Sequence, residues 1–152
     1  MEYVRLIARM RKMPNKALRI LIADDQHFSR LRIERALNHL GYYRIAPMHR
    51  LEEVLSALEY DCEPLDLLII NASLVKGVKF DLFSFCMDNP YVRYAMIYDE
   101  RQSGIPAFLV CRQDKVLISA LPLPDLDTLT QLMARVDPVS YTHLTLPTSD
   151  LV

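Results

Sequence analysis

Polar side chains that could do chemistry follow the apolar runs of this sequence, and two of them are adjacent carboxylates. Asp24 and Asp25 come directly after one apolar run, and two further runs end at Asn71 and Tyr98. If these runs are parallel strands, their carboxyl ends meet at one edge of a sheet and line a crevice in which ligands bind. Carboxylate oxygens are ligands that magnesium prefers. Because Asn71 adds only a neutral oxygen, the sequence predicts that Asp24 and Asp25 bind magnesium weakly, if at all.

The elements that would position these residues alternate between strand and helix patterns. Apolar runs predict strands over residues 18–23, 43–48, 65–70, 94–98 and 116–120. Helical periodicity follows Asp25, spans 52–60, follows Asp81 and spans 126–136. This alternation predicts an α/β fold with a doubly wound, five-stranded parallel sheet of the flavodoxin-like (βα)5 type. The fourth helix is the weakest element, because residues 107–111 favour a strand, so that helix is expected to be short, distorted or replaced by a hairpin.

Two of the helices carry a buried face and end signals that the sequence defines. On the first helix the predicted face consists of Phe28, Ile33, Leu37 and Leu40, with Gly41 just past the end. On the final helix it consists of Leu126, Leu129, Met133 and Val136, with Asp125 as the N-cap.

The order and spacing of these landmarks resemble the receiver domain of bacterial response regulators, over about residues 18–136. The resemblance places Asp24 and Asp25 at the acidic pair that helps to hold magnesium. It places Asn71 at the phosphoacceptor aspartate, Tyr98 at the Thr/Ser switch and Leu121 at the lysine that neutralises the phosphoryl group. It implies a chemotaxis-regulator-like fold and a place in two-component phosphorelay signalling.

Three of these positions hold residues that cannot do the family's chemistry. The amide nitrogen of Asn71 is not nucleophilic, and the phenol of Tyr98 cannot place its hydroxyl where a threonine would. Leu121, or Leu123 in the alternative register, supplies no positive charge. The sequence therefore predicts that phosphotransfer is lost, and that the amide of Asn71 hydrogen-bonds within its own loop.

Composition and the missing motifs narrow the classes of function. A chain of 152 residues with 51% hydrophobic residues fits one folded domain, and a net charge of −1 gives no general attraction to nucleic acid or membranes. No phosphate-binding loop, HExxH or GxSxG motif is present, so the chain is predicted to have no catalytic residues, no cofactor and no enzymatic activity.

The cysteines and the length of the apolar runs indicate the cytoplasm as the expected compartment. Cys62, Cys86 and Cys111 are odd in number and scattered, which fits buried apolar thiols in a reducing cytosol. No apolar run approaches the roughly 18 residues that span a bilayer. We expect a cytoplasmic protein that contacts neither membrane nor nucleic acid directly.

The two ends of the chain are set apart from the predicted domain. Residues 139–148 resemble a translated frame of a sequencing-library adapter, so residues 139–152 are expected to be an artefact. Residues 1–12 are expected to be a nonfunctional or mis-started extension, since Met13 is a better start. Residues 13–138 then form the receiver-like domain.

The resulting prediction is a pseudo-receiver that acts by protein–protein contact, independently of phosphorylation. Receiver domains bind partners or a second copy through the face formed by the fourth helix, fifth strand and final helix. In this chain Tyr94, Tyr98, Phe108 and residues 121–123 would make that face apolar. One alternative is the input domain of a truncated regulator, with a lost DNA-binding or other effector domain, that senses a ligand or metal at the acidic pocket. Another is a domain without a site, in which Asp24 and Asp25 only cap the first helix.

Overall fold

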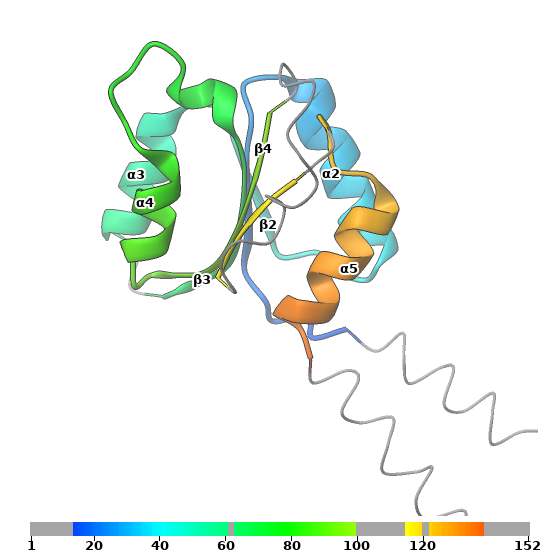
Figure 1. The fold of residues 1–152 in the computed structure, drawn as a ribbon. Helices are drawn as coiled ribbons and strands as arrows, with labels where there is room; N and C mark the ends of the chain where they lie inside the picture. The colour runs from blue at the N-terminus through cyan, green and yellow to red at the C-terminus, as the bar shows by residue number, and fades with distance from the viewer. Residues whose placement is uncertain (1–13, 61–62, 100–114, 120–121, 139–152) are drawn as a thin grey trace, which may run out of the picture.

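The computed structural model describes residues 14–60, 63–99, 115–119 and 122–138, and these form one sheet with helices on both faces (Figure 1). The strands are β1 (Ile20–Ala23), β2 (Ile45–Met48), β3 (Leu65–Asn71), β4 (Val92–Tyr98) and β5 (Val116–Ile118). The helices are α2 (His27–His39), α3 (Leu51–Tyr60), the 3₁₀-helix η1 (Ala72–Val75), α4 (Leu82–Asp88) and α5 (Leu126–Val136). The predicted strands and helices of the described residues are confirmed, with bounds that shift by a few residues.

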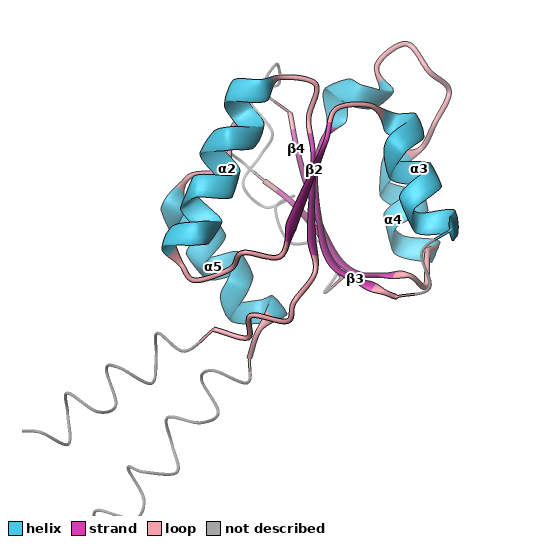
Figure 2. Cartoon of the chain, turned by 180° about the vertical axis from the view of Figure 1, so that it is seen from behind, coloured by secondary structure: helices cyan, strands magenta, loops and turns pink. Residues whose placement is uncertain are grey.

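All strand pairs are parallel, and the spatial order is β2-β1-β3-β4-β5. Helices α2 and α5 cover one face of the sheet and α3 and α4 cover the other, as the two opposite views show (Figures 1 and 2). This is the doubly wound, flavodoxin-like α/β arrangement that the sequence predicts. In such a sheet the strand order reverses beside β1, and the crevice at the carboxyl ends of β1 and β3 is the place for a ligand.

The sheet separates the core into two apolar layers because successive strand side chains point to opposite faces. Ile22 and Ile69 pack under α2 and α5, whereas Leu21 and Leu68 pack under α3 and α4. Each of these side chains is at most 3% exposed. Burial of one such side chain contributes about 1.5–3 kcal/mol to folding.

The helices bury most, but not all, of their predicted faces. Ile33 and Leu37 of α2 and Leu129 and Met133 of α5 are buried, and Asp125 is the N-cap, accepting a hydrogen bond from Thr128 N at 2.8 Å. The predictions for Phe28 and Leu126 are wrong, because these side chains are 67% and 41% exposed. Both belong to the first turn of their helices, which begins at the edge of the sheet, where the layer of strand side chains no longer covers them.

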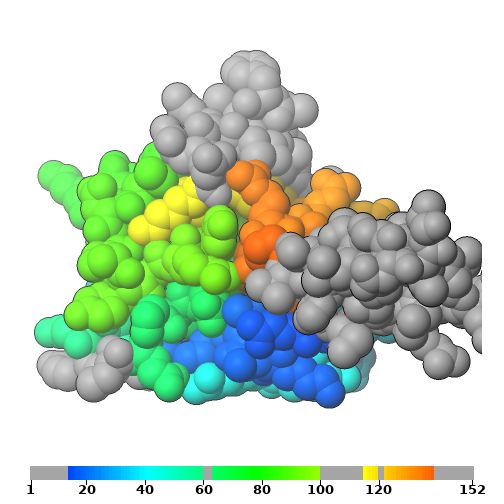
Figure 3. Space-filling model, turned by 90° about the horizontal axis from the view of Figure 1, so that it is seen from below, coloured from blue at the N-terminus to red at the C-terminus, as the bar shows by residue number. Residues whose placement is uncertain are grey.

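Asp137 joins three segments at the amino-terminal edge of the strands. It directly follows α5 and is only 2% exposed, and its Oδ2 accepts hydrogen bonds from Tyr42 Oη at 2.8 Å and Asn15 N at 2.9 Å. In the view from below, the segment that begins at residue 14 lies beside the end of α5 (Figure 3). One carboxyl therefore ties the start of the domain to the ends of α2 and α5.

Some predictions fall on residues outside the described part of the chain. They concern the fourth helix, Phe108, Leu121, Cys62, Cys111 and the two ends of the chain at residues 1–12 and 139–152. Cys86 is described, and it is buried in α4 as predicted; burial raises the pKa of its thiol to about 12. Within the described ranges, no helix has both the length and the apolar character that crossing a bilayer requires.

Two glycines with positive φ allow a matched test of the contact between Pro14 and the end of α2. Gly41 (φ +101°) follows α2, and a Cβ there would clash with Cγ of Pro14, whereas a Cβ at Gly77 (φ +78°) meets nothing within 4 Å. Gly77→Ala should cost only the backbone strain of about 1–2 kcal/mol. Gly41→Ala adds the clash with Pro14 and should cost roughly a further 1–3 kcal/mol. Urea unfolding followed by circular dichroism measures both, and equal losses would contradict a packed contact between Pro14 and Gly41.

Candidate functional site

The candidate site is a row of polar side chains across the carboxyl ends of adjacent strands. Ala23 of β1 pairs with Ile70, so Asp24 lies next in register with Asn71, and Asn71 itself pairs with Tyr98 of β4. The alternation of side chains places all three on the face that α2 and α5 cover. Parallel pairing therefore brings together residues that are 47 and 27 positions apart in the sequence.

Hydrogen bonds to the carboxyl of Asp24 join these three side chains. Oδ2 of Asp24 accepts from Nδ2 of Asn71 at 3.1 Å and from the hydroxyl of Tyr98 at 2.5 Å. Oδ1 of Asp24 accepts from the backbone N–H of Gln26 at 2.9 Å. Both oxygens of the carboxyl are therefore engaged. We call Asp24, Asn71 and Tyr98 the Asp24 network.

The Asp24 network is shielded from water. Asp24 and Tyr98 are 0% exposed and Asn71 is 1% exposed. A buried polar group that loses its partner costs about 1–3 kcal/mol, and more if it is charged. The three side chains therefore depend on one another, because removal of either donor leaves Asp24 short of a partner that water cannot replace.

The other half of the Asn71 amide holds the loop that follows β3. Oδ1 of Asn71 accepts from the backbone N–H of Ser73 at 3.0 Å, and Asn71 is the N-cap of η1. The predicted hydrogen bond within the loop is confirmed. Asparagine suits this place because its amide offers a donor to Asp24 and an acceptor to the loop at the same time.

The turn between β1 and α2 is fixed around Asp24 by its backbone. The N–H of Asp24 donates to Met48 O at 3.0 Å, and Nη1 of Arg30 donates to Asp24 O at 2.6 Å. Helix α2 begins at His27, and its N-cap, Gln26, makes no side-chain capping bond. The alternative in which Asp24 and Asp25 merely cap this helix is wrong for Asp24, whose carboxyl lies in the Asp24 network.

The acidic pair is divided between the interior and the surface. Asp24 is buried, whereas Asp25 is exposed to solvent. Among the residues that the structure describes, no group of three or more His, Cys, Asp or Glu side chains could hold a metal ion. A magnesium ion bound by Asp24 would have to displace the donors of Asn71 and Tyr98, which disfavours it. Weak magnesium binding stays a prediction.

Two features of this edge differ from the sequence analysis or were missed by it. Tyr98 cannot contribute to an apolar partner surface, because it is fully buried and its hydroxyl points to Asp24. Ser119 continues the row, since Ile97 pairs with Ile118 and Ser119 is next in register, opposite Tyr98; Ser119 is 3% exposed. The alternation of Leu117 and Ser119 along the strand was the signal that could have revealed this position. The lysine-equivalent Leu121 lies outside the described residues.

A scan of the sequence against models of protein families finds no match, and a search of curated proteins finds none either.

Removal of the Tyr98 hydroxyl should measure the strength of the Asp24 network. Tyr98→Phe leaves Oδ2 of Asp24 with Asn71 as its remaining side-chain donor, and should lower the free energy of unfolding by about 1.5–3 kcal/mol. Tyr94→Phe is the control, because Tyr94 lies on the same strand and face but is only half-buried, and should change stability by less than about 0.5 kcal/mol. Urea titration of the two variants gives the comparison. Equal small losses would show that the phenol of Tyr98 contributes nothing to Asp24.

Proposed function

We propose that this chain is a degenerate receiver domain of the response-regulator type, a pseudo-receiver that signals through protein contact and is not phosphorylated. The observation that carries the proposal is the Asp24 network. At the strand ends where a receiver would carry out phosphotransfer, the buried carboxyl of Asp24 is bonded to an amide and a phenol. The flavodoxin-like strand order and the spacing of the acidic pair support the comparison with receivers.

The chemistry of these residues argues against phosphotransfer. A phosphoacceptor needs a carboxylate oxygen that can attack phosphorus, and the amide of Asn71 delocalises its nitrogen lone pair into the carbonyl group. Its Nδ2 also donates to Asp24, and its Oδ1 accepts from Ser73. Neither atom is left as a nucleophile, so an enzymatic role at this edge is not supported.

The position of Tyr98 supports a fixed signalling state. In receivers the residue at this position moves toward the phosphoryl group and so reports it. Here the phenol is fully buried and hydrogen-bonded to Asp24, and Tyr98 pairs with Asn71 across the strands. The proposed domain therefore presents a constant surface to its partner.

The proposed partner surface is the face of the fourth helix, β5 and α5, where receivers bind a partner or a second copy. Its described part includes α5, with Leu126 41% exposed at the first turn. Tyr98 is removed from this surface, and Tyr94 and Leu123 pack partly against the core. The described part of this surface therefore exposes fewer apolar side chains than the sequence predicts.

The second candidate function is the input domain of a truncated regulator that senses a ligand or metal at Asp24 and Asp25. The exposed carboxylate of Asp25 favours it, since this group is accessible beside the crevice. A ligand that also reached Asp24 would have to open the Asp24 network. Magnesium-dependent shifts of the amides of residues 24–26, 71 and 98 in an NMR titration would favour this function over the pseudo-receiver.

Phosphorylation of the full chain and of Asn71→Asp tests the proposed function. With acetyl phosphate and magnesium, the mass of the wild-type protein should not increase, while an intact receiver domain in the same assay gains a phosphoryl group. Asn71→Asp should also remain unmodified, because the phenol of Tyr98 is hydrogen-bonded to Asp24 and Leu121 supplies no positive charge for a phosphoryl group. Its new carboxylate also lies beside Asp24, which should lower the free energy of unfolding by roughly 3 kcal/mol. Stable, magnesium-dependent phosphorylation of Asn71→Asp would overturn the proposal.

A further inference from the structure

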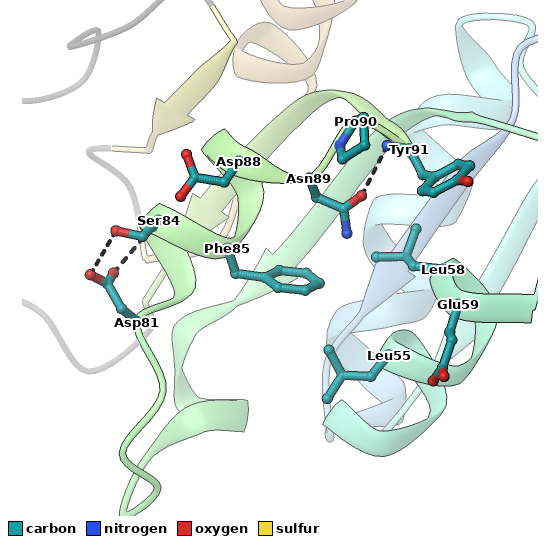
Figure 4. Close-up of a pocket in the computed structure, with 10 residues that line it drawn as sticks. All are labelled: Leu55, Leu58, Glu59, Asp81, Ser84, Phe85, Asp88, Asn89, Pro90 and Tyr91. Atoms are coloured by element: carbon teal, nitrogen blue, oxygen red, sulfur yellow. Dashed lines mark hydrogen bonds between the residues drawn. The ribbon is translucent and has the colours of Figure 1, made fainter.

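A groove of about 720 Å³ lies between α3 and α4, on the face of the sheet opposite α2 and α5 (Figure 4). Both helices contribute apolar side chains to its lining: Leu55 and Leu58 from α3, and Phe85 from α4. Tyr91, in the turn before β4, is 48% exposed at one end of the groove. Its volume is within the range of sites that bind ligands or peptide side chains.

The wall that α4 provides is held in place. The ring of Phe80 packs against that of Phe85, with centroids 5.2 Å apart. At the end of α4, Nζ of Lys115 donates to Met87 O at 3.0 Å and to Asn89 O at 2.8 Å. Oδ1 of Asn89 accepts from Tyr91 N at 2.9 Å, which orders the turn that carries the tyrosine. The groove is therefore a formed feature of the surface.

Among the described residues that line the groove, every side chain that is charged at neutral pH is a carboxylate. The carboxylates are those of Glu59 of α3 and of Asp81 and Asp88 of the α4 segment, and no Lys, Arg or His is among the lining residues. The hydroxyl and the backbone N–H of Ser84 donate to Asp81 and hold its pKa below the ordinary value, so Asp81 is ionised at neutral pH. Glu59 and Asp88 are exposed, and their side chains make no hydrogen bond or ion pair with other described residues.

We propose that this groove binds a basic amphipathic helix of a partner protein. The apolar face of such a helix would cover Leu55, Phe85 and Tyr91, and its Lys or Arg side chains would pair with the free carboxylates of Glu59 and Asp88. Helices bind apolar grooves in this way through residues spaced i, i+3, i+4 and i+7. The acidic rim repels anionic lipid and acidic segments. It therefore selects the sign of the partner's charge as well as its shape. This inference does not depend on the receiver comparison, because it uses the other face of the sheet.

The test is an NMR titration of the full chain, labelled with ¹⁵N, with a 16-residue amidated peptide of leucine and lysine at that helical spacing. Saturable shifts centred on the amides of Leu55, Leu58, Phe85 and Tyr91 are expected. The same peptide with glutamate in place of lysine should not bind. Shifts that spread over the whole surface without saturation, or equal binding of the glutamate peptide, would overturn the proposal.

Variants of the exposed carboxylates separate the groove from general charge attraction. Glu59→Gln with Asp88→Asn should weaken binding of the lysine peptide about fivefold to tenfold, as expected for two exposed ion pairs. Glu34→Gln with Asp127→Asn changes the net charge equally on the opposite face and should leave affinity within about twofold. Circular dichroism confirms that both double variants are folded. Equal weakening in the two double variants would overturn the proposal, as would concentration-dependent self-association that competes with the peptide.

Discussion

The arrangement of the carboxyl edge of the sheet depends on the buried carboxyl of Asp24, which requires hydrogen-bond donors around it. A carboxyl at 0% exposure must be surrounded by donors, and parallel pairing of β1, β3 and β4 supplies them from fixed directions. Asn71 and Tyr98 are adjacent in that row because paired residues on neighbouring strands point their side chains to the same face of the sheet. The loop after β3 and the turn before α2 are then positioned by bonds to the same residues. The burial of one carboxyl, Asp24, is therefore linked to the positions of the neighbouring strands, the loop after β3 and the turn before α2.

The two faces of the sheet consequently have different characters. On the face of α2 and α5, the polar row is sealed, and Phe28 and Leu126 remain exposed at the first turns. On the face of α3 and α4, the core below is fully apolar, and the polar groups lie outside it along the groove. Polar side chains can be buried at the strand ends without loss of stability, because Asp24, Asn71 and Tyr98 are hydrogen-bonded to one another.

The sequence was sufficient for the fold and only partly sufficient for the site. Runs such as residues 65–70, apolar at every position but one, predict a buried parallel strand, and the periodicity of residues 51–58 predicts α3 with its buried Val54 and Leu58. Phe28 was misplaced because periodicity identifies a helix face without locating the end of the sheet beneath it. At the site, the residue types were identified singly. The hydrogen bonds between these residues depend on the register of the strands, which local sequence patterns do not reveal. The hydrogen bond from the hydroxyl of Tyr98 to Asp24 was therefore not predicted.

The described residues on either side of residues 100–114 are held by contacts with other parts of the fold. Before the segment, Tyr98 is held by its bond to Asp24; after it, Lys115 is held by the carbonyls of Met87 and Asn89. Strand pairing between β4 and β5 fixes the separation of the two ends independently of what connects them. The start of the edge strand β5 is therefore tied to the end of α4, so a substitution that moves Met87 or Asn89 should also displace β5.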